Sequence, residues 1–173
     1  MPIGRTVAGR TVVGRIALVA LVAAALAAPA AAQSRVTLGL AAGASSLPST
    51  DRDPRTGRFH SQLVVGVAPH AWPVEFRGDV LWTHWASYAG PVSVTANALA
   101  PVAALALGGP VVLRPYALAG VGTYGVGSVG PRLGANVGAG ARVELGRTAT
   151  FVEVRRHSAY ARTFMTAGMT WRP

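Results

Sequence analysis

The last ten residues of the chain alternate between apolar side chains and small or polar ones. The two faces are Met165, Ala167, Met169 and Trp171 on one side, and Thr166, Gly168, Thr170 and Arg172 on the other. Successive side chains of a β-strand point to opposite faces, so this pattern predicts a strand with one apolar face and one polar face. Such a strand suits a membrane β-barrel, where lipid covers one face and a polar interior covers the other. The rest of the chain must then supply the remaining strands.

The first 32 residues are predicted to be a cleavable signal peptide. Arg5, Arg10 and Arg15 precede an apolar run over residues 16–28, and residues 30–32 form an A-x-A cleavage site. The apolar run is shorter than the about 20 residues that a membrane-spanning helix needs, so a helical anchor is the less favoured alternative. We therefore expect residues 33–173 to form the mature protein, as one domain.

The composition narrows the function classes. The chain is 51% hydrophobic and 13% charged and has no cysteine, which excludes disulfides and thiol chemistry. The longest apolar stretch after residue 32, over residues 92–107, is interrupted by Asn97 and Pro101. A net charge of +10 is typical of nucleic-acid-binding proteins. Nucleic-acid binding is not favoured here, because the arginines are spread along the chain and the protein is predicted to be exported. An apolar, exported chain without a spanning helix favours a membrane barrel in the bacterial outer membrane.

Eight segments suit β-strands, and their connections indicate how the strands are joined. The segments are residues 35–44, 61–68, 74–83, 92–106, 111–124, 132–145, 148–157 and 163–172. The connections are predicted to alternate between longer and shorter, with residues 45–60 long, 70–73 short and 84–91 longer again. Outer-membrane barrels have short periplasmic turns and longer outer loops. The sequence therefore predicts an all-β, eight-stranded antiparallel transmembrane barrel, an up-and-down meander with both ends on the periplasmic side.

Alternation within the segments agrees with this fold. In residues 132–145 every odd position is apolar, and the even positions are glycine, asparagine or charged. For residues 114–120 the pattern does not indicate which of the two faces would meet lipid. A soluble sandwich would alternate as well, but small apolar residues on one face and charges in mid-strand on the other favour a barrel that side chains fill.

Acidic and arginine side chains are predicted to meet inside the barrel. They form three clusters in sequence, which are Glu75, Arg77 and Asp79; Arg142 and Glu144; and Glu153 and Arg155. Buried charges cost several kcal/mol each unless they are paired, so we expect an interior ion-pair network. The favoured interpretation is a plug that fills the lumen, and the alternative is an ion path or gate.

His157 and Ser158 are the candidate catalytic pair for a hydrolase. Adjacent residues of a strand point to opposite faces, so the two side chains would meet only at a bulge. The other histidines, His60, His70 and His84, show no metal-ligand spacing. We therefore predict no catalytic residue, no metal site and no cofactor.

Three motifs resemble those of the small eight-stranded outer-membrane β-barrel proteins, the group of the outer membrane protein A transmembrane domain and the opacity-type porins. Residues 114–122 (RPYALAGVG) look like the Pro-Tyr-x-x-x-Gly-x-Gly strand of the group. Residues 151–157 (FVEVRRH) are similar to Phe-x-Glu-x-Arg-Tyr-His, with Arg156 in place of tyrosine. In the last motif the matching residues are Thr166, Gly168, Met169 and Trp171, followed by Arg172-Pro173 instead of a terminal aromatic.

The resemblance implies a fold, partners and a location. The last motif would be the insertion signal that the barrel-assembly machinery binds, and the mature barrel would contact outer-membrane lipid and lipopolysaccharide as a monomer. We expect a non-enzymatic barrel with a structural or surface-interaction role. The alternatives are a narrow porin or small-solute binder, a lipid A hydrolase that uses His157 and Ser158, and a soluble periplasmic β-protein.

Overall fold

The computed structural model describes residues 34–45, 59–70, 72–85, 88–126, 131–159 and 162–173. The strands are β1 (Ser34–Ser45), β2 (Phe59–Pro69), β3 (Glu75–Trp85), β4 (Tyr88–Pro101), β5 (Leu105–Gly108), β6 (Val111–Val126), β7 (Arg132–Leu145), β8 (Thr148–His157) and β9 (Arg162–Trp171). None of the described residues belongs to a helix long and apolar enough to cross a membrane. The predicted signal peptide and most of the predicted loop at residues 45–60 lie outside the described residues.

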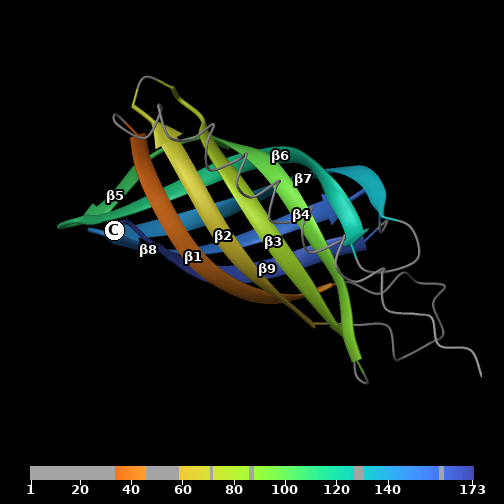
Figure 1. The fold of residues 1–173 in the computed structure, drawn as a ribbon. Coiled ribbons are helices and arrows are strands. Elements are labelled where there is room, and N and C mark those ends of the chain that lie inside the picture. Colours follow the sequence, from red (N-terminus) through yellow and green to blue (C-terminus); the bar gives the residue numbers. More distant parts are fainter. Residues whose placement is uncertain (1–33, 46–58, 71, 86–87, 127–130, 160–161) are drawn as a thin grey trace, which may run out of the picture.

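The strands close into a barrel (Figure 1). Each strand pairs with its neighbours in an antiparallel ladder, in the order β4-β3-β2-β1-β9-β8-β7-β6-β5, and β4 also pairs with β6. The first strand lies against the last, with Leu38 opposite Trp171 and Ser45 opposite Phe164. The C-terminal strand therefore forms one side of the seam where the chain closes on itself.

The predicted strand at residues 92–106 is divided in the structure. β4 ends at Pro101 and β5 starts at Leu105, and both pair with β6, so together they fill one position of an eight-stranded barrel. Proline has no backbone N–H to donate, and Pro101 lies close to Pro115 of β6, where Val102 N donates to the Pro115 carbonyl at 2.9 Å. Two prolines in one part of the ladder explain the interruption.

The predicted alternation of connection lengths is wrong at one hairpin. β3 continues to Trp85 and β4 starts at Tyr88, so only two residues separate them, fewer than the five residues 70–74 between β2 and β3. His84 pairs with Ala89 across this hairpin, after a register shift that follows Trp82. Gly90 and Pro91 favour a loop locally, but they belong to β4 and lie at this register shift, and the pairing resumes beyond them at Ala89 and Tyr88. The hairpin projects at the lower right of Figure 1.

The two ends of the barrel are defined by these connections. The turn end is the end of the barrel where β2 is followed by β3, β5 by β6 and β7 by β8. The loop end is the opposite end, where β1, β3, β6 and β8 finish. Ser34 pairs with Pro69, and Trp171 pairs with Thr148, so both termini of the barrel domain lie at the turn end. The predicted placement of the two ends on one side is therefore correct, because the number of strand positions is even.

Nearly all charged side chains of the strands lie on the inner face, as the sequence predicts, together with buried apolar ones such as Leu81 and Phe151. Apolar side chains point outward, for example Leu133 (87% exposed) and Val152 (60% exposed), while the charged residues of β3 and β8 are mostly buried inside. The structure also settles the face of β6 that the sequence left open. Tyr116 and Leu118 are buried in the interior, and Val121 faces outward with 65% exposure.

Candidate functional site

Four charged side chains from two strands meet in the middle of the barrel interior. Arg77 and Asp79 lie on β3, Glu153 and Arg155 lie on β8, and these two strands occupy opposite positions in the closed barrel. All four side chains are at most 4% exposed. We call these four residues the central ring.

The central ring alternates in charge, and each member contacts both residues of opposite sign. Arg77 binds Asp79 (Nε to Oδ1, 3.1 Å) and Glu153 (Nη2 to Oε2, 2.7 Å). Arg155 binds Asp79 (Nη1 to Oδ2, 2.6 Å) and also pairs with Glu153. Burying charge is costly unless good pairing and further hydrogen bonds compensate for lost hydration. A ring of two arginines and two carboxylates has no net charge and meets the first condition.

Neutral side chains from other strands meet part of the second condition, although Arg77 Nε, Asp79 Oδ1 and Arg155 Nε have no hydrogen-bond partner among the described residues. The Tyr116 hydroxyl donates to Glu153 Oε2 at 3.0 Å, and the Asn97 amide donates to Asp79 Oδ2 at 2.8 Å. The Arg77 guanidinium lies 5.4 Å from the centroid of the Phe151 ring. The central ring is therefore held by β4 and β6 in addition to its own two strands.

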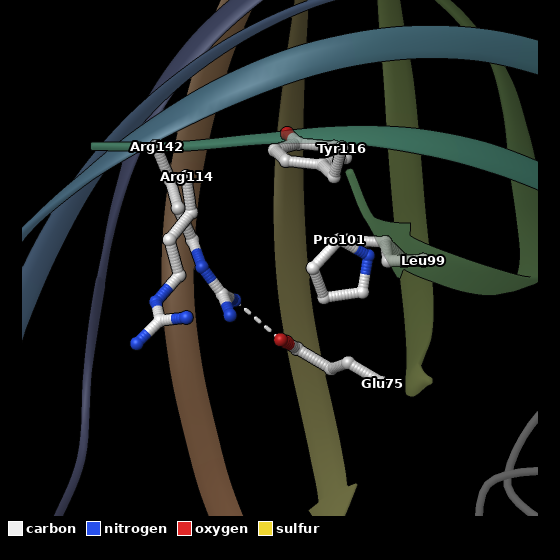
Figure 2. Close-up of a pocket in the computed structure, with 6 residues that line it drawn as sticks. All are labelled: Glu75, Leu99, Pro101, Arg114, Tyr116 and Arg142. Atoms are coloured by element: carbon white, nitrogen blue, oxygen red, sulfur yellow. Dashed lines mark hydrogen bonds and ion pairs between the residues drawn. The ribbon is translucent and has the colours of Figure 1, made fainter. Parts of the chain in front are cut away.

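A second cluster of charges lies at the turn end (Figure 2). Its members are Glu75, Arg114, Arg142 and Glu144, which we call the mouth cluster. Arg114 and Arg142 are direct register partners on β6 and β7. Figure 2 shows the two side chains next to each other, with a dashed line that marks the ion pair between Arg142 and Glu75. Glu144 bridges them, at 3.0 Å from Arg114 Nε and 3.1 Å from Arg142 Nε, and Arg142 also pairs with Glu75. These side chains are 9–35% exposed, so the mouth cluster is partly hydrated.

A third cluster, mostly aromatic, fills the interior near the loop end. Phe164 packs edge-on against two histidine rings, at 5.2 Å from His60 and 4.7 Å from His157. His157 Nδ1 lies 3.0 Å from the Tyr124 hydroxyl, and His60 Nε2 lies 2.8 Å from Thr166 Oγ1. All five side chains are buried, so this loop-end cluster closes the interior above the central ring.

The predicted charged residues are all found inside the barrel, but the structure groups them differently. Glu75 is close to Arg77 and Asp79 in sequence, yet it pairs with Arg142 in the mouth cluster. Arg77 and Asp79 instead meet Glu153 and Arg155 across the lumen. Sequence reasoning missed Asn97, Arg114 and Tyr116. The alternation of Arg114, Tyr116 and Leu118 was a usable signal, since all three positions share one strand face.

The residues of the predicted insertion signal lie on both faces of β9. Thr166 is buried inside, Gly168 is on the same face, and Met169 and Trp171 point outward with 51% and 39% exposure. This is the split between faces that the alternation predicts.

His157 and Ser158 have separate hydrogen-bond partners. The buried His157 ring bonds to Tyr124, whereas Ser158 is exposed and its Oγ accepts a hydrogen bond from the Ala135 N–H at 2.9 Å. A serine nucleophile needs a base within hydrogen-bond reach, and Ser158 Oγ is bonded to the Ala135 N–H while the His157 ring is bonded to Tyr124. Within the described ranges, no group of three or more histidine, cysteine, aspartate or glutamate residues could hold a metal ion.

Comparison with solved structures shows the fold. The N-terminal β-barrel domain of OprF from Pseudomonas aeruginosa matches with a TM-score of 0.54 and 16% identity, over 82% of this chain and all of that one. The designed transmembrane β-barrel TMB2.3 matches with a TM-score of 0.51 and 16% identity, over 80% of this chain and 94% of that one. Neither a protein-family model nor a curated protein matches the sequence. The predicted eight-stranded outer-membrane type of barrel is thus confirmed as a fold, and a designed protein that shares it shows that the fold alone assigns no function.

Proposed function

We propose that this protein is a non-enzymatic integral barrel of the bacterial outer membrane, with a lumen that the central ring closes. Its role would be structural or would lie in surface interactions at the loop end. The observation that carries the proposal is the central ring itself. Two of its four buried ion pairs, Arg77–Glu153 and Arg155–Asp79, join the opposite strands β3 and β8.

The outward face supports a membrane location. Among the strand residues whose side chains the structure describes, that face carries one charged residue, Arg156, next to the last position of β8 at the loop end. An arginine on the lipid face costs about 2–4 kcal/mol at the bilayer midplane but about 0–1 kcal/mol near the interface. The distribution of charge therefore fits a strand that enters a bilayer, and it does not fit a water-exposed sheet.

The seam of the barrel supports a role for the C-terminal strand in insertion. β9 pairs with β1 and β8, so barrel closure requires this last strand. Thr166, Gly168, Met169 and Trp171 would be the residues that the assembly machinery binds before closure. The separate partners of His157 and Ser158 favour a non-enzymatic protein over a lipid A hydrolase.

Ion conductance in planar lipid bilayers tests the closed lumen. We expect the wild-type protein to give no steady channel, because the central ring and its neighbours exclude water from the middle of the barrel. The charge-neutral double variant Asp79→Ala/Arg155→Ala removes half of the ring and leaves the 2.7 Å pair between Arg77 and Glu153, so it should conduct.

The matched control removes two ion pairs at the turn end, Arg114–Glu144 and Arg142–Glu144. Arg114→Ala/Glu144→Ala deletes two side chains that are 35% and 23% exposed and leaves the central ring intact, so the lumen should stay closed. A steady channel in the wild-type protein would instead support the narrow-porin alternative, and a closed Asp79→Ala/Arg155→Ala variant would show that the ring is not the plug.

A further inference from the structure

Three arginines at the turn end lie beside the mouth cluster and share its cleft. Arg35 lies near the start of β1, Arg147 lies in the β7–β8 turn, and Arg172 follows β9. They line one cleft together with Glu75, Arg142 and Glu144. The cleft is open to solvent. We call Arg35, Arg147 and Arg172 the rim arginines.

The carboxylates of the cleft are already engaged. Glu144 bridges Arg114 and Arg142, and Glu75 pairs with Arg142. None of the ion pairs in the described part of the chain includes a rim arginine. The cleft therefore carries positive charge that its own acidic residues do not neutralise.

Backbone contacts hold two of the rim arginines in place. Arg172 N donates to the Arg147 carbonyl at 2.8 Å, and the Arg172 guanidinium donates to the Gly146 carbonyl. Gly146 adopts a φ of +66°, a conformation that glycine tolerates best, which allows a two-residue turn here. Arg172 thus fixes the end of β9 to the β7–β8 turn.

The third rim arginine comes from the neighbouring strand. β1 pairs with β9, and β9 pairs with β8, so the three rim arginines lie on adjacent positions around one mouth of the barrel. Guanidinium groups bind carboxylate and phosphate oxygens through paired N–H donors, and several of them can share the oxygens of one multiply charged anion.

We propose that this cleft is a binding site for phosphate groups, with Arg35, Arg147 and Arg172 as the ligand-binding residues. The phosphate chemistry could come from a soluble phosphate compound or from a phospholipid headgroup on the turn side of the membrane. A multiply charged phosphate uses three guanidinium groups more fully than a single carboxylate does. This site is separate from the central ring and does not depend on whether the lumen conducts.

Calorimetric titration with pyrophosphate tests the site in the folded protein. The protein is held in dodecyl maltoside, a detergent that contains no phosphate. We expect saturable binding, weakened about tenfold or more in Arg35→Gln/Arg147→Gln, because two charge-assisted contacts are lost. Neither residue has an ion-pair partner in the described part of the chain, so the double variant should fold like the wild type.

A matched control removes the same charge at the other end. Arg132→Gln/Arg156→Gln changes two exposed arginines at the loop end and should bind pyrophosphate like the wild type. Equal weakening in both double variants would mean that net charge alone attracts the anion, and it would overturn the proposal.

A lipid arm of the experiment identifies the source of the phosphate. Native mass spectrometry of the protein with phosphatidylglycerol should show a retained lipid that Arg35→Gln/Arg147→Gln loses, if a headgroup is the ligand. Pyrophosphate binding without lipid retention supports a soluble phosphate compound. Absence of binding in both arms would overturn the site and leave the proposed closed lumen untouched.

Discussion

Replacing Glu153 with alanine is expected to lower the free energy of unfolding by about 3–5 kcal/mol, because it breaks a buried ion pair on one side only. The Glu153 side chain is fully buried and contacts Arg77, Arg155 and the Tyr116 hydroxyl. After the change, two buried arginines would share Asp79 alone. Urea unfolding in phospholipid vesicles, followed by tryptophan fluorescence, measures the loss.

The matched control for this prediction is Glu144→Ala in the mouth cluster. Glu144 also contacts two arginines, but its side chain is 23% exposed and water can replace the carboxylate. Partly hydrated ion pairs contribute about 0–1 kcal/mol, so the control should lose no more than that. Similar losses in the two variants would show that the central ring stabilises the fold no more than a surface pair does.

Gly140→Ala is expected to destabilise the barrel by about 1–3 kcal/mol, the usual cost of overpacking a filled interior. A methyl group at this position would lie 2.6 Å from Cζ and the hydroxyl of Tyr116, and 2.6 Å from the Val152 carbonyl oxygen. Tyr116 would have to move, and its hydrogen bond to Glu153 would be lost or weakened. The urea midpoint in the same vesicles measures the effect.

Gly78→Ala is the control on the opposite face of the barrel. Gly78 points outward in β3, and an added methyl group would lie 3.9 Å from the Val65 carbonyl oxygen, which is ordinary contact. Glycine within a strand costs about 0.5–1 kcal/mol relative to alanine, so this variant should be as stable as the wild type or slightly more so. If Gly140→Ala were tolerated as well as Gly78→Ala, the interior would not be packed as described.

Alternation of side chains made most of the fold predictable. The period of two in residues 132–145 and 163–172 assigned each side chain to the lumen or to the lipid, and the structure agrees with that assignment. Local turn signals were less informative. Gly90 and Pro91 indicate a loop, but pairing between β3 and β4 extends past them because the partner strand supplies the hydrogen bonds.

The interior site was predictable in its residues and not in its contacts. Strand parity places Arg77 and Glu153 inside, but it does not say that β3 and β8 face each other across the lumen. That relation depends on barrel closure and on strand tilt. As a result Arg77 pairs with Glu153, whereas Glu75 pairs with Arg142. Tyr116 was missed for the same reason, since its partner Glu153 lies on β8, which is not adjacent to β6. Asn97 was missed because the bond to Asp79 on the neighbouring β3 depends on the exact register of the two strands.

Cell fractionation combined with gel migration tests the central claim, an outer-membrane barrel, most directly. We predict that the protein is recovered in the outer-membrane fraction, needs detergent for extraction, and migrates faster before boiling than after it. A closed barrel keeps its compact shape in detergent until heat separates β1 from β9, where the chain closes on itself. Recovery in the soluble fraction, with the same migration before and after boiling, would contradict the account.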